Sequence, residues 1–135
     1  MLTTIEFDTP ANESLTNLTA RINAAVQGSG VQEGLCVAYV PHTTAAITIN
    51  SGMDPATALD IVAEYHRMVP TRVDFQHQYD TPADASGHIK ATMVGNNVSI
   101  IVTNGKLLLG GSESVLFFEF DGPRRRKVIL RILKD

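Results

Sequence analysis

The dipeptide Asn104-Gly105 most constrains the fold of this chain, because it predicts a two-residue β-hairpin. Type I′ hairpin turns need a positive φ at both central residues, and Asn followed by Gly adopts them readily. A β-branched run from Val98 to Val102 precedes the turn, and Lys106 to Leu109 follows it as the return strand. Two further β-prone runs, Ser114 to Phe120 and Arg126 to Leu133, come next. The last third of the chain is therefore expected to form antiparallel strands.

The rest of the chain alternates between strand and helix patterns. The patterns predict strands at Leu2–Phe7, Leu35–Val40 and Ala45–Ile49, and helices at about Asn12–Val26, Pro55–Met68 and Asp84–Val94. Residues 71–83 have no clear period and are expected to form a loop. Two to three helices combined with a mostly antiparallel sheet predict an α+β fold, with residues 1–135 forming a single domain.

Two of the helices carry distinct signals. In the first, Leu15, Leu18, Ile22 and Val26 recur at helical spacing and form an apolar stripe. The helix after Asp54-Pro55 begins with an N-cap residue followed by proline. That second helix is expected to bury one face, which includes Leu59, Val62, Tyr65 or His66, and Val69.

Composition narrows the class of protein. The chain has 135 residues, 44% apolar and 19% charged, so it can form a core and does not resemble a disordered protein. Its net charge of −3 argues against a nucleic-acid partner. Its single cysteine, Cys36, rules out an internal disulfide and any multi-cysteine metal site. Without a signal peptide pattern or an apolar run of about 20 residues, a cytoplasmic protein with no membrane partner is expected.

The segment Pro41-His42-Thr43-Thr44 is the strongest candidate for a functional site. It lies at the exit of an apolar strand, and imidazole is well suited to proton transfer near neutral pH. Hydroxyls and backbone amides at a strand end can also hold a phosphate or a carboxylate. The alternative is a strand terminus at which the threonines close local hydrogen bonds. The residue pattern alone leaves both interpretations open.

Each of the other three histidines could have a structural or a functional role. His66 lies in a helix pattern and is expected to be structural. Asp84 and His88 are four residues apart, so on a helix they would face the same way, as metal ligands, as a base with its orienting carboxylate, or as a surface contact. Two histidines with an aspartate are a suitable set of ligands for zinc or another transition metal. His42, His77 and His88 form the candidate metal set, although their spacing matches no metal motif.

Several residues could bind a substrate anion. Lys90 and the basic run from Arg124 to Arg126 could hold a phosphate by charge and by bidentate hydrogen bonds, although such runs are usually solvated faces. Asn50 could either cap a turn or direct its amide into a site. Gly110, in a glycine-rich stretch, would let an anion approach the backbone closely.

Many segments together resemble one known family. The matching segments, in order, are Pro41–Asn50, Asp54-Pro55, Asp60, Val69-Pro70, His77, Ala83-Asp84, His88–Ala91, Gly95–Val98, Thr103–Leu107, Leu109-Gly110 and Glu119–Arg126. They resemble the YjbQ-like family, whose members are often labelled secondary thiamine-phosphate synthase. The resemblance covers nearly the whole chain, and its most specific parts are the motifs around His42 and His88.

The resemblance implies a fold, an assembly and an activity. It implies a compact α+β domain that assembles as a homotrimer, with sites in clefts near subunit contacts. It implies an enzyme that joins a pyrimidine diphosphate to a thiazole phosphate, for which a divalent metal such as Mg²⁺ or Zn²⁺ would absorb the charge of the leaving group. The expected catalytic residues are His42, Asp84 and His88. The expected substrate or anion ligands are Thr43, Thr44, Asn50, Lys90, Gly110, Arg124 and Arg126.

The chain departs from the family pattern at two places. Ser51-Gly52 stands where the family usually has Glu-Asn, and Gly111-Ser112-Glu113 stands where it usually has Thr-Trp-Gln. Both places are expected to be loops, so the fold should be retained. The changes favour an alternative function, a non-catalytic homotrimer that binds a metal or an anion. A third hypothesis is a structural subunit whose basic run is only a charged strand edge.

Overall fold

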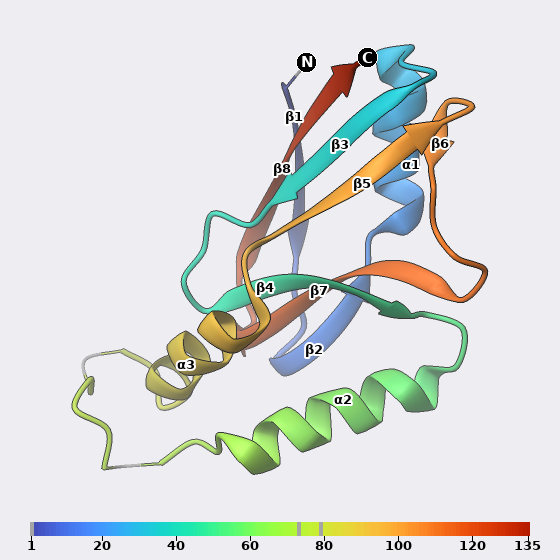
Figure 1. Cartoon of the computed structure of the whole chain (residues 1–135). Helices are drawn as coiled ribbons and strands as arrows, with labels where there is room; N and C mark the ends of the chain where they lie inside the picture. The colour runs from blue at the N-terminus through green and yellow to red at the C-terminus, as the bar shows by residue number, and fades with distance from the viewer. Residues whose placement is uncertain (1, 73, 79) are drawn as a thin grey trace.

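The computed structural model describes residues 2–72, 74–78 and 80–135 (Figure 1). The described elements are β1 (Leu2–Asp8), β2 (Asn12–Asn17), α1 (Thr19–Ser29), β3 (Gly34–Tyr39), β4 (Ala45–Ser51), α2 (Pro55–Met68), α3 (Asp84–Val94), β5 (Asn97–Thr103), β6 (Lys106–Leu107), β7 (Glu113–Gly122) and β8 (Arg125–Lys134). Within this part of the chain, no helix has both the length and the apolar character needed to cross a membrane.

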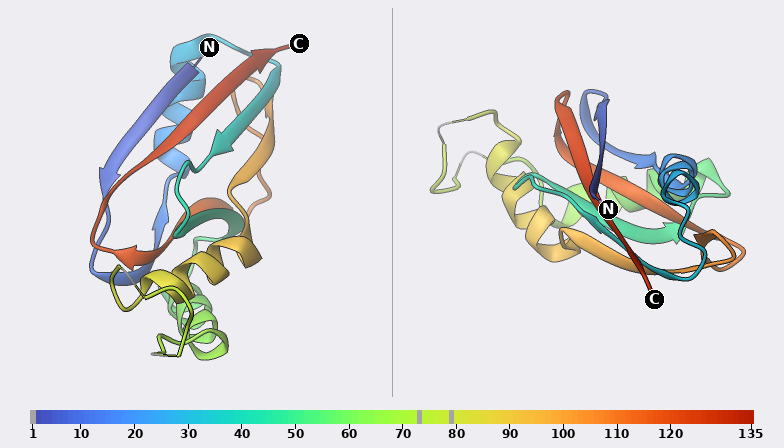
Figure 2. Two further views of the ribbon diagram at one scale, coloured as in Figure 1. Left: turned by 90° about the vertical axis from the view of Figure 1, so that its left-hand side faces the viewer. Right: turned by 90° about the horizontal axis from the view of Figure 1, so that it is seen from above.

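The strands form two antiparallel sheets. One has the order β1-β8-β3-β5-β6 and the other the order β2-β7-β4. Helix α1 lies against the five-stranded sheet, while α2 and α3 lie together at the end of the molecule that holds the three-stranded sheet (Figures 1 and 2). The architecture confirms the predicted α+β class with mostly antiparallel strands.

The three-stranded sheet is buried on both faces. In β7, Val115 and Phe117 join α1 and the inner face of the five-stranded sheet in the main core. The alternate residues Phe118 and Phe120 point the other way and pack in a second core with α2 and α3. Because both faces of β7 are covered, the strand is buried almost continuously and carries the apolar run Val115–Phe118. This sheet therefore forms the layer on which α3, with its candidate site residues, is mounted.

The structure confirms the elements that had the strongest local sequence signals. Asn104 and Gly105 have φ values of 53° and 74°, as a type I′ turn requires. Helix α2 has the predicted bounds, and Asp54 caps it by accepting a hydrogen bond of 2.9 Å from the amide of Ala56. Helix α3 also has the predicted bounds, and the amide of Gly95 closes it on the carbonyl of Ala91.

The prediction of a helix from Asn12 to Val26 was wrong in its first half. Residues Asn12–Asn17 form β2, which pairs with β7, and the helix begins only at Thr19. Leu15 packs on the second core, whereas Leu18, Ile22 and Val26 belong to the main core. The apolar spacing that suggested one helix therefore arises from a strand and a helix facing different cores.

The packing of α2 also differs from the prediction. Leu59 was expected in the core, but it is 71% exposed. The helix contacts the second core through Val62 and Tyr65, as predicted, and through Ile61, which was not predicted. The partly buried Val62 and Val69 agree with the prediction. The buried stripe of α2 therefore does not include Leu59.

A candidate metal-binding site

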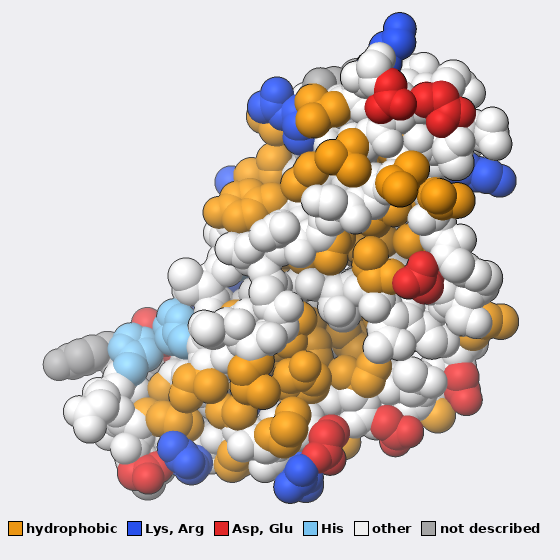
Figure 3. Space-filling model, in the orientation of Figure 1, with side chains coloured by type: hydrophobic (Ala, Val, Ile, Leu, Met, Phe, Trp, Pro, Cys, Tyr) orange, Lys and Arg blue, Asp and Glu red, His pale blue; other side chains and the backbone are white. Residues whose placement is uncertain are grey.

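Helix α3 is held close to the segment Pro41–Thr44. Gly87, in the middle of α3, permits this approach, since a Cβ there would lie only 3.3 Å from Cβ of Thr44. The same packing buries Asp84 in the first turn of the helix. Histidine side chains reach the surface at this end of the molecule (Figure 3). The fold thus brings α3 and the turn before β4, which are about forty residues apart in sequence, to one site.

His77, Asp84 and His88 form a close cluster. Both imidazoles place Nε2 beside Oδ2 of Asp84, at 2.5 Å for His77 and 3.0 Å for His88. The two rings are 5.2 Å apart between centroids. Asp84 is 8% exposed at its side chain, whereas the two histidines are about 40% exposed. A buried carboxylate therefore holds two imidazoles that remain open to solvent on their outer sides.

The electrostatics keep Asp84 ionised. Burial by itself raises the pKa of this carboxyl, but the hydrogen bond from His77 and the charge and hydrogen bond of His88 outweigh it. The net result is a pKa below the ordinary value for aspartate. A carboxylate that is ionised at neutral pH is the form that can ligate a cation.

The cluster fits a divalent transition metal. One ligand atom from each of the three residues lies within 4.8 Å of the others. Zinc binds imidazole nitrogen and carboxylate oxygen at about 2.0–2.2 Å, so a small rotation of the side chains would close the site around an ion. Two nitrogens and one oxygen suit zinc or a similar metal better than Mg²⁺, which prefers oxygen ligands. Three protein ligands would leave coordination positions for a substrate.

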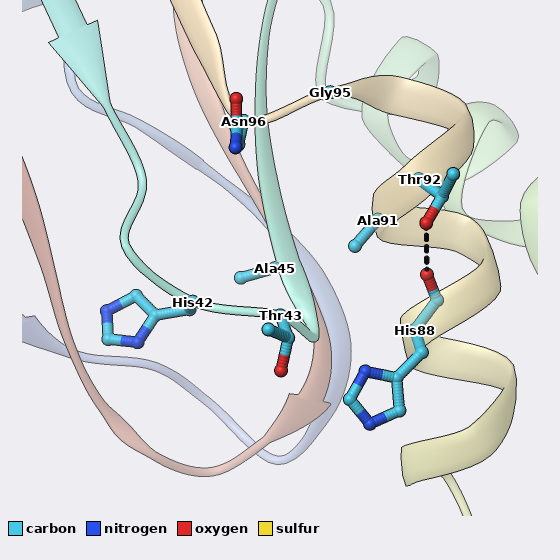
Figure 4. Close-up of a pocket in the computed structure, with 8 residues that line it drawn as sticks. All are labelled: His42, Thr43, Ala45, His88, Ala91, Thr92, Gly95 and Asn96. Atoms are coloured by element: carbon cyan, nitrogen blue, oxygen red, sulfur yellow. Dashed lines mark hydrogen bonds between the residues drawn. The ribbon is translucent and has the colours of Figure 1, made fainter.

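His42, which was predicted to be a metal ligand, lies outside this cluster. It borders a cavity of about 460 Å³ together with Thr43 and His88, and in Figure 4 the Thr43 side chain lies between the two rings. Nε2 of His42 accepts a hydrogen bond of 3.0 Å from the amide of Lys127. Among the described residues, the group whose ligand atoms lie close enough to hold an ion contains Asp84 in place of His42.

The environment of His42 also defines its protonation. Burial and then the positive charge of Arg126 lower its pKa below the ordinary value, and the hydrogen bond from Lys127 opposes them only in part. His42 is therefore a neutral imidazole at pH 7, with its proton on Nδ1. In this state it can donate a hydrogen bond to a ligand, rather than accept a proton through Nε2.

A second cavity, of about 310 Å³, adjoins the cluster and holds several predicted anion ligands. It is lined by residues that include His42, Thr43, Thr44, Asp80, Asp84, Arg124 and Arg126. Arg126, however, is 5% exposed and pairs with the buried Glu119, with a distance of 2.5 Å from Nη2 to Oε2. The same guanidinium donates to Oγ1 of Thr44 at 2.9 Å. Arg124 pairs with Asp121 at 2.8 Å. These cations are therefore engaged within the chain.

Three predicted site residues lie away from the cluster. Lys90 is fully buried and pairs with Glu13. Asn50 is exposed and accepts a hydrogen bond from the amide of Ser51, near the end of β4. Gly110 belongs to the loop between β6 and β7, at the opposite end of the three-stranded sheet from α3 (Figure 1). Within one chain, the structure does not bring these residues to the histidines.

Sequence reasoning missed two supporting residues. Oδ2 of Asp80 lies 3.6 Å from Nε2 of His77. Thr81 donates a hydrogen bond of 2.5 Å to Oδ1 of Asp121, which ties the loop that carries His77 to the end of β7. The spacing of Asp80, three residues after His77, was an available signal for the first contact, but the second joins residues forty positions apart.

The two stacked antiparallel sheets, with a two-histidine and one-carboxylate cluster at one end, define an α+β protein with a candidate metal centre. The chain belongs to the UPF0047 protein YjbQ-like family, which it matches over residues 3–135. The resemblance found in the sequence is thus confirmed.

Three similar proteins are each covered along nearly their whole length. The UPF0047 protein MJ1081 of Methanocaldococcus jannaschii is 39% identical over 135 residues, covering 100% of this chain and 96% of that protein. The UPF0047 protein YugU of Bacillus subtilis is 33% identical, covering 98% of this chain and 99% of that protein. The crystal structure of hypothetical protein APE1520 from Aeropyrum pernix K1 is similar with a TM-score of 0.93 at 30% identity, covering 100% of this chain and 99% of that one.

Proposed function

We propose that this protein is a cytosolic enzyme that binds a divalent transition metal, zinc by preference, through His77, Asp84 and His88 and acts on a phosphorylated small molecule in the adjoining cavities. The observation that carries the proposal is the convergence of two imidazole nitrogens on one buried carboxylate oxygen. Surface histidines rarely gain from such an arrangement, because it restricts two side chains at one acceptor. A metal ion makes use of all three donors at once.

The charges around the site support a role for the metal in holding the phosphate. Arg124 and Arg126 are both paired with carboxylates, so the cavity offers little uncompensated positive charge of its own. A divalent metal bound by two neutral imidazoles and one carboxylate would retain a net charge of about +1 and would attract a phosphate oxygen. Binding of the anion is therefore expected to depend on the metal.

The reaction to test is the one implied by the family resemblance, in which a thiazole phosphate joins a pyrimidine diphosphate. The thiazole nitrogen forms a bond to the methylene carbon of the pyrimidine as the bond from that carbon to the diphosphate oxygen breaks. The step transfers no proton, so it requires charge stabilisation at the leaving diphosphate. His42, as a neutral donor through Nδ1, and the Thr43 hydroxyl can supply hydrogen bonds to it.

The dependence of phosphate binding on metal tests this proposal. Isothermal titration of pyrophosphate into zinc-loaded protein is expected to show saturable binding, and the same titration into protein treated with EDTA is expected to show none. Zinc-loaded wild-type protein is then expected to turn over the two thiamine precursors. The rate is expected to fall by about 10²-fold for His42→Ala, which is the usual effect of losing one preorganised hydrogen-bond donor. A His66→Ala variant, which removes a histidine outside the site, should behave like wild type. Equal pyrophosphate binding with and without zinc would contradict the proposal.

A non-catalytic metal- or anion-binding protein is the second candidate. It is favoured by one observation, the pairing of Lys90 with Glu13, which removes from the cavity a cation that the catalytic interpretation expected there. The same experiment separates the two functions. Zinc-dependent binding of pyrophosphate without any turnover of the precursors would support the second candidate.

We also propose that the protein assembles as a homotrimer through the outer face of its five-stranded sheet. On that face, Leu35 lies in register with Ile101 on one neighbouring strand and with Leu133 on the other. Ile101 is 57% and Leu133 48% exposed, and apolar side chains gather over this sheet in Figure 3. Exposed apolar clusters of this kind are typical of subunit contacts.

Light scattering coupled to gel filtration tests the assembly. Wild-type protein is expected to have the mass of three chains, and Ile101→Lys is expected to shift it to one chain, because the new charge would be buried without a partner. Leu59→Lys, which changes an apolar residue on α2 that is even more exposed (71%), should leave the mass unchanged. A monomeric wild type, or an unaltered mass for Ile101→Lys, would contradict this interface.

A further inference from the structure

A third cavity lies between α2 and β2. It has a volume of about 430 Å³ and shares no lining residue with either cavity at the histidine cluster. Glu13 of β2, Val62, Ala63 and His66 of α2, and Phe120 of β7 contribute to its wall. Its volume falls within the range that small organic ligands occupy in proteins.

Glu13 gives this cavity an unsatisfied acceptor. Its side chain is 10% exposed, and its Oε1 contacts both Lys90 Nζ and Nδ1 of His66, the latter at 3.2 Å. Its Oε2 is buried and has no hydrogen-bond partner among the residues that the structure describes. Buried polar atoms are nearly always hydrogen-bonded, so an unpartnered carboxylate oxygen on a residue that lines a cavity points to a donor that binds beside it.

The charges around Glu13 restrict what that group can be. Lys90 is fully buried, pairs with Glu13 and lies 5.5 Å from the centre of the Phe120 ring. This pair is neutral as a whole, so the cavity has no spare positive charge for a phosphate or a carboxylate. The buried, unpartnered oxygen can only accept a hydrogen bond when Glu13 is ionised, and its partner must therefore be an N–H or O–H donor. A cationic amine would form the strongest such bond.

Much of the rest of the wall is apolar, although Asn12, His66 and Thr71 also contribute to it. The apolar part of the lining consists of Leu59, which is 71% exposed, the exposed Ala63, the half-buried Val62 and the buried Phe120. An exposed leucine beside an aromatic ring would be covered by the apolar body of a ligand, and burial of that surface would add to the affinity. The exposure of Leu59, which departs from the sequence prediction, is thereby accounted for.

From these contacts we propose that the cavity between α2 and β2 is a second binding site, which takes a small amine with an apolar, ring-sized body and places the amine on Oε2 of Glu13. The site is independent of the metal cluster, because α3 separates the two. Lys90 faces β2 and Glu13, whereas His88 and Thr92 of the same helix line the cavity of the histidines.

Titration of the full chain with benzylamine, followed by NMR in the presence of EDTA, tests the site. Saturable shifts are expected at the amides of Val62 and Ala63, and benzoate, which has the same ring but carries an acceptor, is expected to cause none. Glu13→Gln should weaken benzylamine binding at least tenfold. Because that change leaves Lys90 buried without its partner and could unfold the protein, Ala63→Trp provides an independent test. It fills the cavity from an exposed helix position and should abolish binding, whereas Ala56→Trp, exposed on the same helix outside the cavity, should not.

Three results would overturn the inference. They are benzylamine binding that persists unchanged in Ala63→Trp, benzoate binding as tight as that of benzylamine, and the absence of any saturable shift with benzylamine. The last result would mean that only water satisfies Oε2 of Glu13. Since EDTA is present throughout, a failure of the metal-site proposal would not affect any of these outcomes.

Discussion

Replacing Asp84 with Asn is expected to weaken zinc binding by at least about 100-fold, because it removes the anionic ligand on which the two histidines converge. Asparagine keeps the size of the side chain, but it has no negative charge to offset that of the metal. Its NH₂ group would also donate a hydrogen bond to one of the imidazoles, where the carboxylate oxygen accepts one. Competition against a fluorescent zinc chelator measures the dissociation constant directly.

The matched control for this prediction is Asp80→Asn. Asp80 is also close to His77, but its side chain is 60% exposed and lies at 3.6 Å, so the change should alter zinc affinity less than about tenfold. His88→Ala should resemble Asp84→Asn, since it removes a second ligand. Equal zinc affinities for wild type, Asp84→Asn and His88→Ala would show that the cluster is only a network of hydrogen bonds.

Replacing Arg126 with Met is expected to lower the free energy of unfolding by about 3–5 kcal/mol, the usual cost of leaving one member of a buried ion pair uncompensated. Glu119 is completely buried, and Arg126 bonds both of its carboxylate oxygens. The guanidinium also reaches Thr44, so its loss would loosen the turn that carries His42. Urea unfolding of the two proteins at pH 7, monitored by circular dichroism, measures the difference.

Lowering the pH should change the contribution of Glu119 to the free energy of unfolding in opposite directions in wild type and in Arg126→Met. In wild type, burial raises the pKa of Glu119, but the hydrogen bonds from Arg126, Thr9 and the Asp121 amide outweigh it and leave the pKa below its model-compound value of 4.5. A lowered pKa in the folded state means that the contribution of Glu119 to stability is present above pH 4.5 and is lost as the pH falls through the folded-state pKa. Without Arg126, burial dominates and protonation of Glu119 should relieve part of the destabilisation. The gap between the two proteins should therefore narrow as the pH falls.

Two further variants test whether the buried ion pair is the cause of the stability loss expected for Arg126→Met. Arg125→Met, at a neighbouring arginine that is 61% exposed, should change stability by less than about 0.5 kcal/mol. The double variant Arg126→Met with Glu119→Leu should recover much of the lost stability, because no charge remains buried. A loss for Arg126→Met no larger than that for Arg125→Met would mean that the buried pair contributes little to the fold.

Interactions between residues close in sequence made much of the fold predictable. The φ angles of Asn104 and Gly105, the cap at Asp54 and the closure of α3 at Gly95 each depend on a few consecutive residues. The error at residues 12–26 has the opposite origin. Pairing with β7, about a hundred positions away, makes Asn12–Asn17 a strand, and the apolar spacing of that segment suits a strand and a helix equally well.

The candidate site also combines features that local sequence sets with features that long-range contacts set. The sequence by itself determined that Asp84 and His88 share one face of a helix, because a spacing of four residues fixes their relative direction. It also made His42 a candidate site residue, which stays a prediction. Only the tertiary structure decided that His77 completes the cluster, that Lys127 occupies Nε2 of His42, and that Lys90 turns inward to Glu13. The last two contacts join residues more than seventy positions apart, and they are set by how the two sheets pair and stack, which no local pattern encodes.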